Sequence, residues 1–164
     1  MSGVRLEAKV HIVTGAVASA QNIIKSCNRA GLDVADIVLE QLASSEAVLS
    51  NDEKDLGVCL VDIGGGTTEV AGIFLGGIVH SRSIRIAGDE LDDSIASYVR
   101  RAYNLFIGDR TAEQTKIDIG SAFPLERELE ITIKGRDLVT GLPRSAVISS
   151  EEVRLAIAEP QNAI

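Results

Sequence analysis

The sequence Leu60-Val61-Asp62-Ile63-Gly64-Gly65-Gly66-Thr67-Thr68-Glu69-Val70-Ala71 decides the fold of this chain. An apolar run over residues 58–63 carries a single carboxylate, Asp62, near its end. Three glycines and two threonines follow, and then a second apolar run over residues 70–75. Short apolar runs separated by glycines predict two strands joined by a tight turn. The glycines accept positive φ and leave no Cβ in the way of a ligand.

This turn has the chemistry of a phosphate site. Successive N–H groups in such a turn form a concavity that binds anions, and the hydroxyls of Thr67 and Thr68 add donors. Asp62 repels a phosphate, but it can hold the water shell of a Mg²⁺ that bridges phosphates. A plain glycine-rich hairpin without a ligand is the alternative, and the residues alone leave both interpretations open.

Composition limits the other possibilities. The 164 residues suit one domain or two small subdomains. Tryptophan is absent and aromatic residues are few, so the core must be built from Ile, Val, Leu and Ala, as in α/β proteins. A net charge of −8 without a basic stripe argues against nucleic-acid binding. No apolar run is long enough to span a bilayer and no secretory leader is visible, so we expect a cytoplasmic protein with reduced Cys27 and Cys59.

The part of the chain before the glycine turn predicts a strand–helix–strand unit. Strands are expected at residues 9–14 and 34–39, with a helix over residues 16–30 between them, which implies parallel neighbours. A helix over residues 41–49 and a charged surface loop over residues 51–56 follow. Glu40 then stands at the carboxyl end of a strand, where it either faces a ligand crevice and orients a water or caps the next helix.

The part after the turn predicts a third meander strand and a helix-rich region. The elements expected are a strand at 78–86, helices at 90–103 and 112–122, and antiparallel strands at 128–134 and 144–148 with a turn at 134–137. A last helix is expected to begin near 149 and to end at Pro160. Capping boxes are expected from Thr111 to Gln114 and from Ser149 to Glu152. Glu113 and Lys116, one turn apart, predict a surface ion pair. The composition shift near residue 87 predicts subdomains over residues 4–87 and 88–159, with residues 160–164 beginning a further helix.

Residues 62–69 resemble the second phosphate loop of the superfamily of actin, heat-shock chaperones and sugar kinases. Residues 60–164 are similar to the bacterial actin MreB, with supporting stretches Arg85-Ile86-Ala87-Gly88-Asp89-Glu90 and Lys134-Gly135-Arg136-Asp137-Leu138-Val139-Thr140-Gly141-Leu142-Pro143. Residues 4–60 resemble the cell-division actin FtsA, with Asn22-Ile23-Ile24-Lys25-Ser26 and Asp55-Leu56-Gly57-Val58. We therefore interpret the chain as a fragment or a chimera of two related actin-like proteins, joined within residues 62–68.

The resemblance implies an α/β fold: the second lobe of an actin-like ATPase, ribonuclease-H-like, with a mixed sheet flanked by helices and a smaller α+β subdomain. It implies that Glu40 positions the attacking water, although Gln41 follows where these families usually have proline. It assigns Asp62 to Mg²⁺ through water. It implies that the phosphates are held by Gly64, Gly65, Gly66, Thr67 and Thr68. It places Gly88 in the turn near the cleft, and it implies that the ribose and adenine are held by Glu113, Gln114, Thr115 and Lys116.

The superfamily cleft has two walls, and the first phosphate loop and the late adenosine loop have no counterpart in this sequence. We therefore expect weak binding of ATP or ADP with Mg²⁺, a structural role, no useful ATPase from the chain alone, and self-association through the exposed face of the lobe. The alternatives are a minimal ATP-hydrolysing domain completed by dimerisation and an interaction module.

Overall fold

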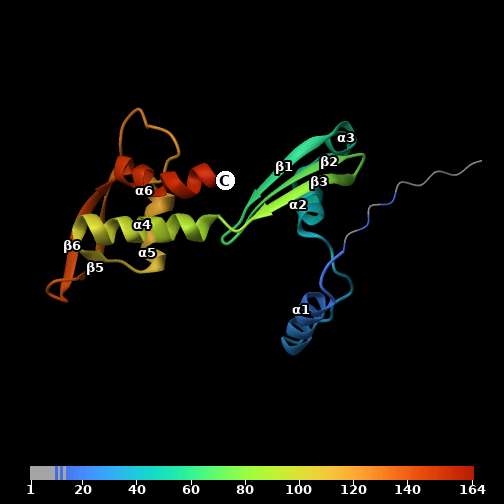
Figure 1. Cartoon of the computed structure of the whole chain (residues 1–164), viewed down its shortest axis with the longest axis horizontal. Coiled ribbons are helices and arrows are strands. Elements are labelled where there is room, and N and C mark those ends of the chain that lie inside the picture. The colour runs from blue at the N-terminus through green and yellow to red at the C-terminus, as the bar shows by residue number, and fades with distance from the viewer. Residues whose placement is uncertain (1–9, 11, 13) are drawn as a thin grey trace, which may run out of the picture. The chain divides into compact units, whose positions relative to one another are not determined.

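The computed structural model of this chain describes residues 10, 12 and 14–164 (Figure 1). The chain divides into two compact units. Unit 1 contains the described residues up to Leu60 together with Val70–Ser81, and unit 2 contains Val61–Glu69 together with Arg82–Ile164. The glycine turn and the segment that leads into the fourth helix therefore belong to the same unit.

Unit 1 carries three helices and most of a three-stranded sheet. The helices are α1 (Val17–Arg29), α2 (Glu40–Val48) and α3 (Asn51–Leu56), and the strands β1 (Val58–Ile63), β2 (Thr68–Phe74) and β3 (Gly77–Ile84) lie in the order β1-β2-β3. Leu75 and Gly76 connect β2 to β3 with φ of 50° and 70°. Positive φ at both central residues is the geometry that two-residue hairpins require. The hairpin expected at Gly76-Gly77 is therefore confirmed, but its two central residues are Leu75 and Gly76, one position earlier.

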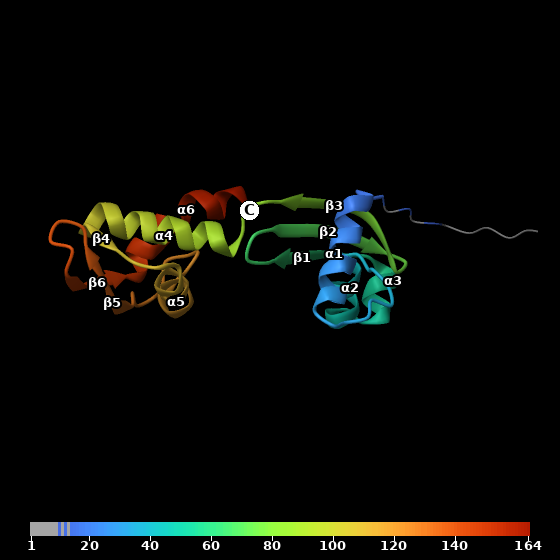
Figure 2. The ribbon, with the colours of Figure 1, turned by 90° about the horizontal axis from the view of Figure 1, so that it is seen from below.

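The core of unit 1 is small. It consists of Leu60, Ala71, Ile73 and Ile78, against which side chains from α2 and its flanks pack. Figure 2 shows the ribbon of α2 beside the strands β1 and β2. Burial of these apolar side chains holds α2 against the strands. The helix predicted over residues 16–30 is confirmed as α1, but none of its residues is buried.

Two expectations for unit 1 are wrong. Residues 34–39 form no strand, because no described neighbour pairs with their backbone, and Leu39 instead precedes α2 as its N-cap. The charged loop expected at residues 51–56 is helix α3, which a capping box between Ser50 and Glu53 begins. Residues 9, 11 and 13 of the strand expected at 9–14 lie outside the described residues, so the predicted parallel pair stays untested there.

Unit 2 packs helices α4 (Gly88–Tyr103), α5 (Asp109–Ile119) and α6 (Ser150–Ala163) with strands β4 (Leu105–Phe106), β5 (Glu130–Asp137) and β6 (Pro143–Ser149). The strands form an antiparallel sheet in the order β4-β5-β6, and Ile131 lies opposite Ile148. Helix α4 contacts both α5 and α6 (Figure 1). Ten buried apolar side chains form the core: Ile95, Val99, Leu105, Ile107, Ala112, Ile119, Ile133, Ile148, Val153 and Ile157.

The boundaries of three elements in unit 2 differ from the predictions. Strand β5 continues to Asp137, whose Oδ1 accepts the N–H groups of Val139 and Thr140, so the turn follows Asp137. Helix α5 begins at Asp109 with Gly108 as its N-cap, which places Thr111 inside the helix and removes the predicted capping box. Helix α6 continues past Pro160 to Ala163, because a proline removes one hydrogen bond without ending the helix here. Its capping box between Ser149 and Glu152 is confirmed.

Candidate functional site

The glycine turn is fixed to the first turn of α4 by two backbone hydrogen bonds. The carbonyl of Gly64 accepts the N–H of Gly88 at 3.1 Å, and the carbonyl of Gly65 accepts the N–H of Asp89 at 2.7 Å. Within the turn, the N–H of Gly64 donates to the carbonyl of Thr67 at 2.9 Å. The loop of residues 64–67, called the glycine loop below, is therefore held at three points although its glycines are exposed.

These bonds decide which N–H groups of the glycine loop remain available. The first two N–H groups of α4, those of Gly88 and Asp89, would be ordinary anion donors at a helix N-terminus, but they already donate to loop carbonyls. Within the part of the chain that the structure describes, the N–H groups of Gly65 and Gly66 donate to no protein acceptor. An anion at this site would therefore meet the amides of Gly65 and Gly66.

Close approach explains glycine at two of these positions. A Cβ on Gly65 would lie 3.3 Å from Oδ1 of Asp89. A Cβ on Gly88 would lie 3.3 Å from the Gly64 carbonyl oxygen and 3.3 Å from Nζ of Lys116. At Gly88 the Cβ would press on the backbone of the glycine loop, whereas at Gly65 it would meet the end of the Asp89 side chain, which can move aside.

Thr68 does not point to a ligand. It is buried, with 2% of its surface exposed, and its Oγ1 donates to the carbonyl of Ile86 at 2.7 Å. The hydroxyl thus joins the start of β2 to the segment before α4. The one hydroxyl proton of Thr68 is used in this internal bond, so the hydroxyl geometry adds no support for a phosphate contact, and the role of Thr68 at the phosphates stays a prediction.

Lys116 links α5 to the first turns of α4, which in turn bond to the glycine loop. Its Nζ lies 2.9 Å from the Asp92 carboxylate and donates to the Gly88 carbonyl at 3.1 Å. The ion pair expected between Glu113 and Lys116 is therefore replaced by one to Asp92, since Lys116 faces α4 whereas Glu113 is exposed. Sequence spacing gave no signal for this pair, because the two residues lie on different helices.

The other α5 residues that are predicted to hold the ribose and adenine divide into two groups by exposure. Glu113 and Gln114 are exposed, and the Gln114 amide donates to Asp118 at 2.7 Å. Thr115 is 1% exposed and its hydroxyl donates to the carbonyl of Thr111 at 2.7 Å. The Thr115 side chain belongs to the interior of unit 2, and the prediction that the segment of residues 113–116 holds the ribose and adenine stays a prediction.

Two carboxylates lie near the glycine loop. Asp62 is half-buried near the end of β1, and Asp89 is exposed with its carboxylate beside Gly65 and Gly66. Carboxylate oxygens are the ligands that Mg²⁺ prefers. No group of three or more His, Cys, Asp or Glu side chains that could hold a metal occurs among the described residues. A metal ion at the loop would therefore need further ligands from a bound molecule or from water.

Glu40 belongs to unit 1, and its role in positioning the attacking water stays a prediction. It is the exposed first residue of α2. It lies at a cavity of about 660 Å³ whose lining is mainly apolar and comes from α1, the start of α2 and the residues before each of them. The apolar lining gives Glu40 no visible phosphate-binding neighbour in its own unit.

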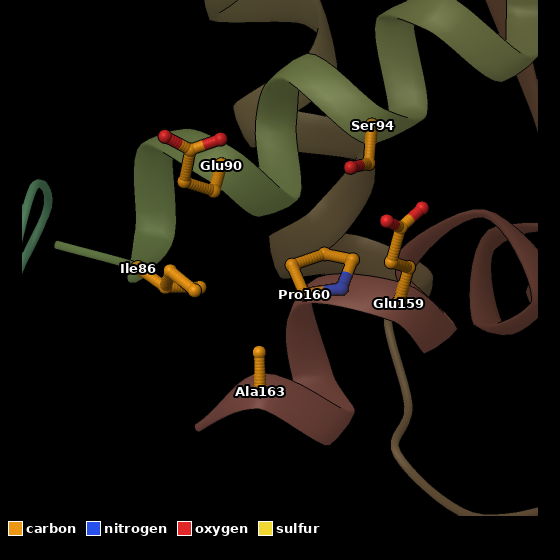
Figure 3. Close-up of a pocket in the computed structure, with 6 residues that line it drawn as sticks. All are labelled: Ile86, Glu90, Ser94, Glu159, Pro160 and Ala163. Carbon is orange, nitrogen blue, oxygen red and sulfur yellow. The ribbon is translucent and has the colours of Figure 1, made fainter. Parts of the chain in front are cut away.

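Unit 2 has a hollow of its own, which lies between the start of α4 and the end of α6 (Figure 3). Its volume is about 310 Å³, and it is lined by Ile86, Glu90, Ser94, Glu159, Pro160 and Ala163. The side chains of Glu90 and Glu159 make this hollow acidic, which disfavours a phosphate. It is therefore no extension of the phosphate chemistry at the glycine loop.

Comparison with known proteins gives a consistent family. The profile of the MreB/Mbl protein family matches residues 11–164. The cell shape-determining protein MreB of Escherichia coli K12 is 42% identical over 142 residues, which cover 87% of this chain and 41% of that protein. The cell division protein FtsA of Pseudomonas aeruginosa is 61% identical over 100 residues, which cover 61% of this chain and 24% of that protein. No helix in the described residues is both long and apolar enough to cross a membrane.

Solved structures agree. MreB 5 of Spiroplasma citri bound to AMPPNP superposes with a TM-score of 0.77 at 38% identity, over 92% of this chain and 45% of that one. The ADP-bound structure of the same protein gives a TM-score of 0.78. The chain thus spans less than half the length of these proteins, and the expected actin-like fold and the resemblance to both MreB and FtsA are confirmed. The chain belongs to the MreB/Mbl family.

Proposed function

We propose that this chain binds Mg²⁺-bound ATP or ADP weakly through its glycine loop, as one lobe of a cytoskeletal protein of the MreB and FtsA kind. The observation that carries the proposal is the pair of exposed N–H groups on Gly65 and Gly66, held in place by the bonds to α4 and without a protein acceptor among the described residues. The family neighbours bound to AMPPNP and to ADP support the choice of ligand.

The donor set at the loop supports specific roles. Gly64, Gly65, Gly66 and Thr67 contact the β and γ phosphates. Asp62 holds the water shell of Mg²⁺, whose octahedral sites usually combine one or two carboxylates with phosphates and water. When bound, the metal supplies positive charge that offsets the phosphates and the nearby carboxylates. The remaining assignments concern the rest of the ligand: Glu113, Gln114 and Lys116 toward the ribose and adenine, Gly88 at the turn beside them, and Glu40 toward the attacking water.

The lobe by itself should not hydrolyse ATP at a useful rate. Phosphoryl transfer depends on positioning and on charge stabilisation from groups around the whole phosphate. This chain covers 45% of the AMPPNP-bound neighbour, so we propose that much of the enclosing wall comes from elsewhere. Weak binding and a structural role follow from that division.

We also propose self-association and a cytoplasmic location. Unit 1 exposes large apolar side chains such as Val17, Ile23 and Val38, and exposed apolar surface of this kind favours contact with another chain. Light scattering over a range of concentrations tests this. Cys27 and Cys59 are both free thiols, which a reducing compartment would preserve.

Calorimetric titration with Mg·ADP and Mg·AMPPNP tests the proposed function, with phosphate release measured in parallel. We expect weak binding by the wild type, loss of the Mg²⁺-dependent part in Asp62→Ala, and no change in Asp93→Ala, which removes an exposed carboxylate elsewhere on α4. Absence of any binding would refute the proposal. Turnover above background that disappears in Asp62→Ala would instead favour an ATPase completed by dimerisation.

A further inference from the structure

We infer that Asp92 determines which form of nucleotide the glycine loop accepts: by holding the ammonium group of Lys116, it makes the site select Mg²⁺-bound over metal-free nucleotide. The inference rests on the proposed function and deepens it. It assigns Asp92 the role of a positioning residue, because Asp92 acts on the ligand through Lys116.

Lys116 lies where it could meet a ligand of the glycine loop. Its Nζ bonds to the carbonyl of Gly88, whose own N–H bonds to Gly64. The position of a Cβ on Gly88 lies 3.3 Å from Nζ and 3.5 Å from Cα of Gly65, so all three crowd the same space. The ammonium group is therefore beside the loop without touching the N–H groups that would meet a phosphate.

Asp92 holds this cation in place and neutralises it. The two side chains are only 23% and 14% exposed, so water screens their attraction less than at the surface. Oδ1 of Asp92 is buried and has no well-aligned hydrogen bond, although Nζ lies 2.9 Å away. Nζ attracts this oxygen even without an aligned N–H, because attraction between charges depends little on angle.

Because the charges of Lys116 and Asp92 offset each other, the electrostatic potential at the glycine loop depends mainly on the other nearby carboxylates. Asp89 lies directly beside Gly65 and Gly66, and Asp62 lies near the end of β1. A metal-free polyphosphate meets these carboxylates as like charges, whereas Mg²⁺ offsets two negative charges and brings waters that carboxylates can accept. Removal of the Asp92 charge would free Lys116 to pair with the phosphates and would favour the metal-free form most.

The test measures the dissociation constant of ADP by calorimetry, once with Mg²⁺ and once with EDTA, and compares the ratio of the two constants between variants. We expect Asp92→Asn to lower the ratio of the EDTA to the Mg²⁺ constant by about tenfold, since one nearby charge is unmasked in a partly buried site. Asp93→Asn is the matched control, because it removes the same charge from an exposed position on the same helix. It should change the ratio by less than about twofold.

A second variant separates a charge effect from a loss of structure. In the double variant Asp92→Asn with Lys116→Met, the ratio should return toward the wild-type value, because the freed cation is gone. If Asp92→Asn fails to fold, Lys116→Gln gives the converse test: it leaves the Asp92 charge without its cation, so the ratio of the EDTA to the Mg²⁺ constant should rise above the wild-type value. The ratio is compared rather than either constant alone, because loss of a Lys116 contact to the ribose weakens both constants together. A ratio in Lys116→Gln that equals or falls below the wild-type value would overturn the inference.

The outcomes distinguish this inference from the proposed function. If the wild type binds ADP but a folded Asp92→Asn keeps the wild-type ratio, the role of Asp92 is refuted and the proposed function stands. If the wild type binds ADP under neither condition, the proposed function fails and the inference fails with it.

Discussion

The two units of this chain use similar sequence patterns with different results. In unit 2, ten buried apolar side chains from all three helices and from the sheet form one core. In unit 1, four buried apolar side chains form the core, and the thirteen residues of α1 contribute none. An amphipathic pattern therefore predicts that a helix exists, whereas burial depends on partners that the pattern does not reveal.

The largest expected difference between the units is in the unfolding free energy that is lost when an isoleucine is shortened to alanine. Ile95→Ala removes a side chain that is 0% exposed in unit 2, and we expect a loss of about 2–5 kcal/mol in the free energy of unfolding. Ile23→Ala in α1 removes a side chain that is 55% exposed, and we expect a change below about 0.5 kcal/mol. Urea unfolding followed by circular dichroism measures both. Equal losses would mean that α1 is buried in solution.

Glu152 gives a second contrast, because both units contain a capping box. Oε1 of Glu152 accepts the hydroxyls of Tyr103 at 2.6 Å and Tyr98 at 3.2 Å, while Oε2 accepts the N–H of Ser149 at 3.0 Å. Oε2 also accepts the hydroxyl of Ser149 at 3.2 Å, so Glu152→Gln weakens four charge-assisted bonds, and we expect a loss of about 2 kcal/mol. Glu53→Gln in unit 1 weakens bonds to Ser50 alone and should cost less. Thermal melting compares them, and a larger effect in Glu53→Gln would contradict the account.

The same network predicts how stability depends on pH. Burial and the hydrogen bond to Glu152 raise the pKa of Tyr103 from 10.0 to about 12, so its stabilisation is complete below pH 10 and is lost as pH rises toward about 12. Burial opposes a low pKa at Glu152, but its hydrogen bonds outweigh burial and lower the pKa below 4.5. The contribution of Glu152 is therefore complete above pH 4.5 and is lost in more acidic solution.

Tyr103→Phe isolates the alkaline part of this dependence. We expect the variant to lose much of the decrease in unfolding free energy that the wild type shows above pH 10, while its acidic decrease remains. Urea titrations at a series of pH values provide the measurement. An alkaline slope identical to that of the wild type would show that Tyr103 does not titrate with folding.

The smallest contrast concerns two glycines. Gly88→Ala places a Cβ 3.3 Å from the Gly64 carbonyl oxygen, and we expect a loss of about 1 kcal/mol and weaker nucleotide binding. Gly15→Ala in unit 1 meets nothing within 4 Å and should be neutral or stabilising by up to about 0.5 kcal/mol. Gly88→Ala should therefore lower the melting temperature, whereas Gly15→Ala should leave it unchanged or raise it. A Gly88→Ala melting temperature at or above that of the wild type would mean that the contact between α4 and the glycine loop tolerates a methyl group.

The sequence predicted the elements whose pattern is long or whose turn chemistry is explicit. Helix α4 and strand β6 are found within two residues of their expected bounds, and the Ser149 capping box is present. Residues 34–39 were misread because a short apolar run is equally compatible with an unpaired segment beside a helix. Helix α3 was missed even though Ser50 and Glu53 have the spacing of a capping box.

The candidate site was predictable only in part. The glycine loop is found as the predicted turn between two strands, because glycines between two short apolar runs are an explicit turn signal, whereas the roles of the loop and of Asp62 toward phosphate and Mg²⁺ stay predictions. The internal hydrogen bonds of Thr68 and Thr115 could not, because their acceptors are backbone carbonyls fixed by the fold. The contact between Asp92 and Lys116 joins two helices, so no local spacing indicated it.

Backbone amide NMR during a titration with Mg·ADP tests the central claim most directly, since it reports each N–H group of the glycine loop separately. The resonances of Gly65 and Gly66 should shift most, and that of Gly64 should shift less because its N–H already donates to Thr67. Unchanged resonances of Gly65 and Gly66 at concentrations where ADP binds elsewhere would contradict the account.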